Sequence, residues 1–189
     1  MDTADSSKDW DAILPVRTEE ERRARALRLA AVRETFEESG ILLEEGAKGP
    51  LDDVLGWRDR VHTDANAFVD LFRSRSSRPA VRSLALRSNW VTPRSERRRF
   101  DTYFFIALAP SLPSRAKQDV LSSDAGDDAT VDNEQVLAAD GKETVSAEWL
   151  TPGEALRRAF AKEAALMPPQ IYNLAELPKD WRASCRDSF

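Results

Sequence analysis

The sequence is poor in the side chains on which several common active sites depend. Its 189 residues include one histidine, His62, and one cysteine, Cys185. This pair cannot form a Cys/His zinc site or a disulfide framework, and a Ser-His-Asp or Cys-His mechanism would have to use His62. The seven glycines are scattered, so the sequence contains neither G-x-G-x-x-G nor a Walker A loop. The remaining chemistry must rely on carboxylates, basic side chains, hydroxyls, or a metal bound by oxygen ligands.

The chain also lacks excess positive charge and long apolar runs. Its 28 Lys and Arg residues against 33 Asp and Glu give a formal net charge of -5, which argues against a nucleic acid polymer as partner. No apolar run approaches the roughly 18 residues of a membrane span. The beginning, MDTADSSKDWD, resembles neither a secretory signal nor an Arg-rich transit peptide, and the end, DSF, is not S-K-L. We therefore expect an intracellular protein.

The strongest local signal predicts a helix over 19–39. Thr18 and Glu21 have the spacing of a capping box, which satisfies free backbone N–H groups at a helix start. The stretch that follows contains no Pro or Gly and is rich in strong helix formers. Gly40 stands where a glycine commonly ends a helix.

Alternating helical and extended patterns predict an α/β chain. We expect further helices over 55–73, 151–166 and 170–177, and strands over 81–91, 100–109 and 143–150. The strand over 100–109, FDTYFFIALA, is predicted to be buried because it is rich in aromatic and β-branched residues. Pro168 and Pro169 are expected to interrupt the helical pattern. Residues 110–141 have little apolar periodicity and are interpreted as a long insertion.

Three glutamates lie on one face of the predicted helix 19–39. Glu34, Glu37 and Glu38 have the i, i+3, i+4 relation, which brings their carboxylates within about one turn. Their mutual repulsion would be removed by a cation, and oxygen-only ligation suits Mg²⁺ or Mn²⁺. Arg33 is four residues before Glu37 and can form a salt bridge with it. The alternative is an ordinary solvated helix face. The full pattern R-E-x-x-E-E-x-G, however, matches by chance only about once in a million windows.

The segment from Arg33 to Ile41 resembles the second half of the Nudix box, G-x5-E-x7-R-E-U-x-E-E-x-G-U, where U is a bulky apolar residue. Thr35 stands at the first U position. The first half does not match, because the leading Glu of the box falls at Arg25 and its leading Gly at Glu19.

Further segments are similar to one Nudix branch, called nucleoside diphosphate-linked moiety X motif 19. In order along the chain they are AAVRETFEESGILL, WRDRV, NWVTP, RRFDTYFF, EWLTPGEA and MPPQIY, and they cover roughly residues 19–175. That branch also departs from the leading Glu. The resemblance implies a Mg²⁺- or Mn²⁺-dependent diphosphatase whose small-molecule substrate is coenzyme A or one of its esters. It implies a peroxisomal or mitochondrial location, although without a recognisable signal a cytoplasmic location stays open.

The resemblance also implies roles for individual residues. Glu34, Glu37 and Glu38 match the metal-binding glutamates, Arg33 matches the residue that orients them, and Glu38 is the best candidate for the base. Glu143, ahead of Trp149, is a candidate for an outlying carboxylate near the metal. Apart from the resemblance, three adjacent basic residues ahead of the strand at Phe100 either clamp a phosphate-rich substrate or form a solvated loop: Arg97, Arg98 and Arg99.

The implied fold is a Nudix-like α/β/α sandwich with a mixed sheet. We expect a polar N-terminal segment over 1–16, the domain over 17–178 with a disordered acidic insertion at about 112–141, and a C-terminal tail over 179–189. Only about 16 residues precede the helical region and they contain no Gly, so the N-terminal strand and the Gly-rich loop of the family are expected to be missing. Residues 10–16 would supply at most one short edge segment. The sequence leaves the oligomeric state open.

Three alternatives to an active diphosphatase stay open. The chain could be a fragment or truncated gene model of an enzyme. It could be a non-catalytic Nudix-derived module that binds nucleotides or a protein. It could also be a helical interaction protein whose glutamate face is fortuitous.

Overall fold

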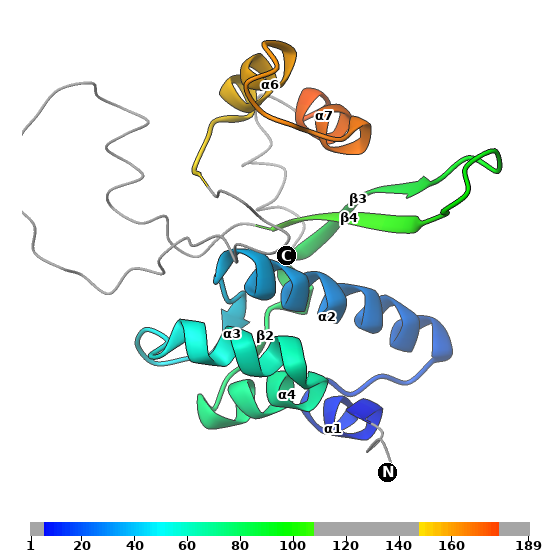
Figure 1. Ribbon diagram of the computed structural model, residues 1–189. Coiled ribbons are helices and arrows are strands. Elements are labelled where there is room, and N and C mark those ends of the chain that lie inside the picture. Colours follow the sequence, from blue (N-terminus) through cyan, green and yellow to red (C-terminus); the bar gives the residue numbers. More distant parts are fainter. Residues whose placement is uncertain (1–5, 108–147, 178–189) are drawn as a thin grey trace, which may run out of the picture. The chain divides into compact units, whose positions relative to one another are not determined.

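The computed structural model describes residues 6–107 and 148–177, which belong to two compact units (Figure 1). The first unit comprises residues 6–81 and Glu148, and the second comprises residues 82–107 and 149–177. Both helices and strands are present, as expected of an α/β chain. Within these described ranges, no helix has the length and apolar character needed to cross a membrane.

The longest element of the first unit is helix α2 (Glu19–Ser39), which confirms the predicted boundaries. The Thr18 hydroxyl accepts a hydrogen bond of 3.1 Å from the Glu21 amide, and the Glu21 carboxylate accepts one of 3.2 Å from the Thr18 amide. Hydrogen bonds from the Arg17 and Thr18 amides to the Glu21 carboxylate hold the pKa of Glu21 below its usual value. Gly40 ends the helix with φ of 77°, and its N–H donates to the Phe36 carbonyl.

Three further helices complete the core of the first unit: α1 (Ser6–Ile13), α3 (Val54–Thr63) and α4 (Ala65–Ser74). Trp10 of α1 packs on Phe68 and Phe72 of α4, with ring centroids 5.7 and 6.1 Å away, and Figure 1 shows α1 beside α4. The expected extended segment over 10–16 is not seen, because residues 10–13 belong to α1 and residues 14–16 form no strand.

The single helix predicted over 55–73 is in fact two. The chain breaks at Asp64, whose carboxylate accepts a hydrogen bond from the Asn66 amide and caps α4. This break turns the buried face of α4 toward α1, while α3 lies against α2.

A short antiparallel ladder joins β1 (Glu44–Glu45) to β2 (Arg78–Pro79). Beside it, Arg75 makes a forked contact with Glu44, with Nη2 2.7 Å from Oε1 and Nε 2.9 Å from Oε2. Both side chains are largely buried, and the Ser77 hydroxyl donates to the second carboxylate oxygen. Arg75 thereby links the end of α4 to the strand that follows the glutamate-bearing helix.

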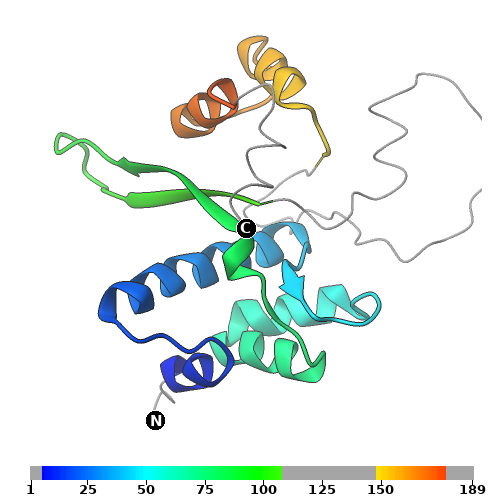
Figure 2. The same ribbon diagram turned by 180° about the vertical axis from the view of Figure 1, so that it is seen from behind.

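The second unit contains a β-hairpin of β3 (Leu84–Val91) and β4 (Asp101–Ala107) (Figure 2). The strands pair antiparallel from Leu84 opposite Ala107 to Val91 opposite Asp101, with an irregularity between Leu86 and Ser88. The prediction that the second strand is buried is wrong, since none of its residues is fully buried. Aromatic and β-branched residues are common in strands because they pack well on a pleated, half-buried surface, so their presence does not indicate complete burial.

The expected mixed sheet is not seen in the described ranges, where both ladders are antiparallel. Of the strand predicted over 143–150, residues 143–147 lie outside the described residues, and residues 148–150 form no strand. The predicted insertion over 110–141 and the tail over 179–189 also lie outside them.

Two helices accompany the hairpin: α6 (Pro152–Phe160) and α7 (Pro168–Ala175). Figure 2 shows them side by side, with α7 next to β3. Tyr172 of α7 meets Trp90 of β3 edge-on at 5.4 Å between ring centroids. Helix α6 ends at Phe160, earlier than predicted, so Pro168 and Pro169 do not interrupt it. They begin α7 instead, since proline at the first helical turn loses no hydrogen bond.

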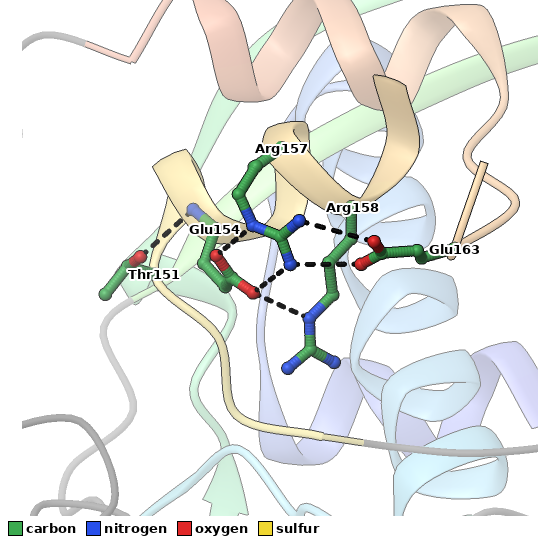
Figure 3. A network of polar contacts seen from close by, with 5 residues as sticks. All are labelled: Thr151, Glu154, Arg157, Arg158 and Glu163. Carbon is green, nitrogen blue, oxygen red and sulfur yellow. Dashed lines mark hydrogen bonds and ion pairs between the residues drawn. The ribbon is translucent and has the colours of Figure 1, made fainter. Parts of the chain in front are cut away.

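Polar and charged side chains form a network along α6 (Figure 3). It extends from Thr151, just before the helix, to Glu163, three residues after its last residue, Phe160. The Thr151 hydroxyl caps the helix, and Glu154 accepts hydrogen bonds from Arg157 and Arg158. Arg157 also reaches Glu163 at 3.0 Å. The two arginine side chains lower the pKa of Glu154 to about 2.

Candidate functional site

The three predicted glutamates lie in the last turns of α2, the C-terminal end of the helix. Glu34 and Glu38 are exposed. Glu37 is the inner member of the group, because its side chain keeps only 14% of its exposure against 50% for Glu34. The opposite side of the helix carries buried apolar residues: Leu29, Val32 and Phe36. The helix therefore presents its carboxylates away from the apolar core, as the sequence predicts.

Arg33 contacts two of the three carboxylates. Its Nη2 donates to Glu34 Oε1 at 3.0 Å, and its Nε lies 3.3 Å from Glu37 Oε1 as an ion pair without hydrogen-bond alignment. The predicted pair with Glu37 is present, and the contact with Glu34 is additional. A single guanidinium thus links a solvent-facing carboxylate to the inner one.

Helix α3 supplies two residues that sequence reasoning missed at this site. The buried Arg58 side chain donates to the backbone carbonyls of Glu37 and Glu38. One turn later, His62 Nδ1 lies 3.9 Å from Glu37 Oε2. One available signal was the i, i+4 spacing of Arg58 and His62, which places them on one face of their helix. The His62 side chain is half exposed, yet it approaches the inner carboxylate.

The donor set fits a hard divalent cation in its chemistry. Carboxylate oxygens are the ligands that Mg²⁺ and Mn²⁺ prefer. The negative end of the helix dipole attracts a cation, and no basic residue of α2 itself occupies its last turn. Glu37 is engaged by Arg33 and His62, and within the described residues no three His, Cys, Asp or Glu side chains converge as a metal cluster. Cation binding would therefore require the exposed Glu34 and Glu38 side chains to turn toward Glu37.

Arg25 occupies the position at which the sequence departs from the Nudix box, and it has a structural role there. Its side chain is buried, with Nη2 2.7 Å from Asp11 Oδ1 and Nη1 donating to the Leu14 carbonyl. Hydrogen bonds from Arg25 and Arg22 hold the pKa of Asp11 below its usual value. The arginine at this position therefore ties α1 and the following turn to α2.

The basic residues predicted to bind substrate belong to the second unit. Arg97, Arg98 and Arg99 lie in the connection between β3 and β4 and are exposed. Arg99 Nε donates a long hydrogen bond of 3.4 Å to the Thr92 carbonyl across the turn. Their substrate contact stays a prediction, and Glu143 lies outside the described residues.

Comparison with known proteins gives one family match and several relatives. A family profile described as "NUDT19 Nudix domain" matches residues 17–123. The chain is similar to proteins named acyl-coenzyme A diphosphatase NUDT19 from three vertebrates. Identity is 30% over 94% of the chain for Xenopus laevis, 33% over 80% for Gallus gallus and 31% over 80% for Homo sapiens.

The aligned regions cover 43%, 40% and 39% of those relatives, so the chain spans about two fifths of the length of the curated proteins it matches. No solved structure gives a significant match.

Proposed function

The chain belongs to the NUDT19 branch of the Nudix family, and from this premise we propose that it hydrolyses a diphosphate linkage with the help of a divalent cation. The proposed substrate is coenzyme A, an acyl-CoA or a related nucleoside diphosphate derivative. The relatives' printed name, acyl-coenzyme A diphosphatase, supports this substrate class. The observation that carries the proposal is the end of α2, where Arg33 pairs with two of three carboxylates inside the matched segment.

Glu34, Glu37 and Glu38 are the residues that would hold the cation, Mg²⁺ or Mn²⁺. When bound, the cation would supply charge neutralisation at the phosphate oxygens and lower the pKa of a water molecule. Arg33 has a separate task. By pairing with Glu34 and Glu37 it limits the rotamers of both side chains and offsets their mutual repulsion.

Glu38 is the proposed general base. It is exposed, so it can meet a water molecule and a substrate from solvent. Hydrolysis adds one water across the P–O–P linkage: the water oxygen bonds to one phosphorus while Glu38 takes one of its two protons, the second staying on the new phosphate. The bond from that phosphorus to the bridging oxygen breaks, and its electron pair leaves on the other phosphate. Two phosphate monoesters leave. For coenzyme A these are 4′-phosphopantetheine and a nucleoside bisphosphate.

Arg97, Arg98 and Arg99 are proposed to bind substrate phosphates. Guanidinium groups bind phosphate oxygens through paired N–H donors, and three adjacent arginines match a substrate that carries several phosphates. Their exposure leaves their donors accessible to a ligand.

The test is hydrolysis of coenzyme A with Mg²⁺ or Mn²⁺ by the wild-type chain and by Glu38→Gln. Removal of a general base is expected to lower the rate by roughly 100-fold or more. Glu20→Gln is the matched control, because Glu20 is an exposed glutamate at the other end of the same helix. Its rate should stay within about twofold of wild type. Equal rates for wild type and Glu38→Gln would refute the catalytic assignment.

A further inference from the structure

We propose that Arg58 is a positioning residue that holds the metal-binding end of α2 in place, an inference that rests on the proposed function. Arg58 belongs to α3 and the residue is only 6% exposed. Its Nε and Nη2 donate to the Glu37 carbonyl at 3.0 and 2.7 Å, and Nη2 also donates to the Glu38 carbonyl at 2.9 Å. One guanidinium therefore bonds the backbone of two adjacent proposed ligands.

These carbonyls need donors because of where the helix ends. The last four C=O groups of an α-helix have no partner within it. In α2 the Gly40 N–H satisfies the Phe36 carbonyl, and the carbonyls of Glu37 and Glu38, which follow in the same last turn, accept from Arg58. A polar group buried without a hydrogen bond is costly. Arg58 is thus the external C-terminal cap of α2.

The planar guanidinium of Arg58 also fixes the orientation of the peptide groups that it binds. Each bonded carbonyl carbon is attached to the Cα that carries a glutamate side chain, so the orientation of these peptide groups sets where Glu37 and Glu38 start. Rigid planar N–H donors on two successive carbonyls restrict both orientations at once. A lysine ammonium in the same place would keep the charge and lose this planar fork.

The charge of Arg58 is also well placed. Glu37 and Glu38 are carboxylates at the negative end of a helix dipole, an unfavourable arrangement. No basic side chain lies in the last turn of α2, so α3 brings the compensating positive charge from outside. His62, one turn after Arg58, approaches the Glu37 carboxylate itself. Helix α3 therefore contacts both the main-chain carbonyl of Glu37, through Arg58, and the side-chain carboxylate of Glu37, through His62.

The experiment compares Mn²⁺ binding to the wild-type chain, Arg58→Met and Arg60→Met by isothermal titration. It is carried out at a temperature at which circular dichroism shows all three to be folded. Outer-shell partners of metal ligands typically contribute 10- to 100-fold in affinity, so we expect the dissociation constant of Arg58→Met to rise by that factor. Arg60 is a matched control on the same helix, because it lies 3.6 Å over the Trp57 ring and donates to the Gly56 carbonyl within α3. Arg60→Met should bind within about twofold of wild type.

Arg58→Lys keeps the experiment decisive if the methionine variant does not fold. It retains the buried charge without the fork, so an intermediate loss of Mn²⁺ affinity is expected. In all folded variants, amide hydrogen exchange at Gly40 and Ile41 should accelerate in proportion to the loss of affinity, since the end of α2 is released. A variant with a lower Tm but an unchanged dissociation constant and unchanged exchange would show a merely structural residue and overturn the proposal.

Coenzyme A hydrolysis separates this inference from the proposed function. Arg58-dependent Mn²⁺ binding without turnover in wild type would refute the diphosphatase and support the positioning role. Turnover in wild type with an unchanged Mn²⁺ requirement in Arg58→Met would support the diphosphatase and refute the positioning role of Arg58. The absence of Mn²⁺ binding in wild type would overturn both.

Discussion

The forked pair between Arg75 and Glu44 allows a quantitative test of how the first unit is held together. Their side chains are 11% and 9% exposed, and Arg75 reaches both oxygens of the carboxylate. Arg75→Met removes the charge and keeps similar bulk. Glu44 would then be left buried with the Ser77 hydroxyl as its remaining partner in this cluster. Breaking a buried pair on one side typically costs about 3–5 kcal/mol, because an uncompensated charge stays in the interior.

Two further changes isolate the cause of that loss. In the double variant Glu44→Gln with Arg75→Met, no uncompensated charge remains, so we expect part of the lost stability to return. Arg78→Met is the matched control. Arg78 pairs with Glu45 at 3.0 Å on the same ladder, but the two side chains are 56% and 34% exposed. Exposed pairs contribute about 0–1 kcal/mol.

Urea unfolding at neutral pH, followed by far-UV circular dichroism, measures all four proteins. The unfolding free energy should fall by about 3–5 kcal/mol for Arg75→Met and by less than about 1 kcal/mol for Arg78→Met. Losses of the same size for the two single variants would show that burial does not set the contribution of these pairs, and would refute the reasoning.

Three other changes have defined outcomes. Gly40→Ala forces a Cβ into a left-handed conformation and should lower the unfolding free energy by about 1–2 kcal/mol in urea; no loss would contradict the φ of 77°. Thr18→Ala removes half of the capping box and should cost about 1 kcal/mol in the same assay, unless α2 is held by packing alone. The folded pKa of Glu154, about 2, lies below the 4.5 of an unperturbed glutamate, so its stabilising contribution is complete above about pH 4.5 and is lost as the pH falls through 2. The Tm advantage of wild type over Glu154→Gln should therefore vanish over that window, and a constant difference would contradict the assignment.

Local signals predicted the glutamate-bearing helix with correct boundaries. The Thr18 and Glu21 box and Gly40 act on backbone groups within four residues, so their effect does not depend on the rest of the fold. The break at Asp64 was not predicted, because aspartate is tolerated inside a helical pattern and no Pro or Gly stands there. Helix α1 was not predicted, and its Trp10 packs on α4 through a tertiary contact that a local pattern does not contain.

The candidate site was predicted in part for the same reason. Arg33 and the three glutamates are neighbours along one helix, so periodicity alone gathers them. Arg58 contacts that helix from a position 21 residues after Glu37. Its partners are main-chain carbonyls, which every residue has, so the side chains in the sequence do not identify them. A missing basic residue in the last turn of a helix rich in glutamate is the clue that could have prompted a search for a distant cap.

The short chain distance between Arg58 and its partners has an evolutionary consequence. The cap and the carboxylates are separated by 20 and 21 residues and lie within α2, α3 and their connection. A sequence that gains or loses residues after α3 leaves these bonds within one continuous stretch. The carboxylate helix and its cap can therefore be inherited as a module, while the later part of the chain diversifies around it.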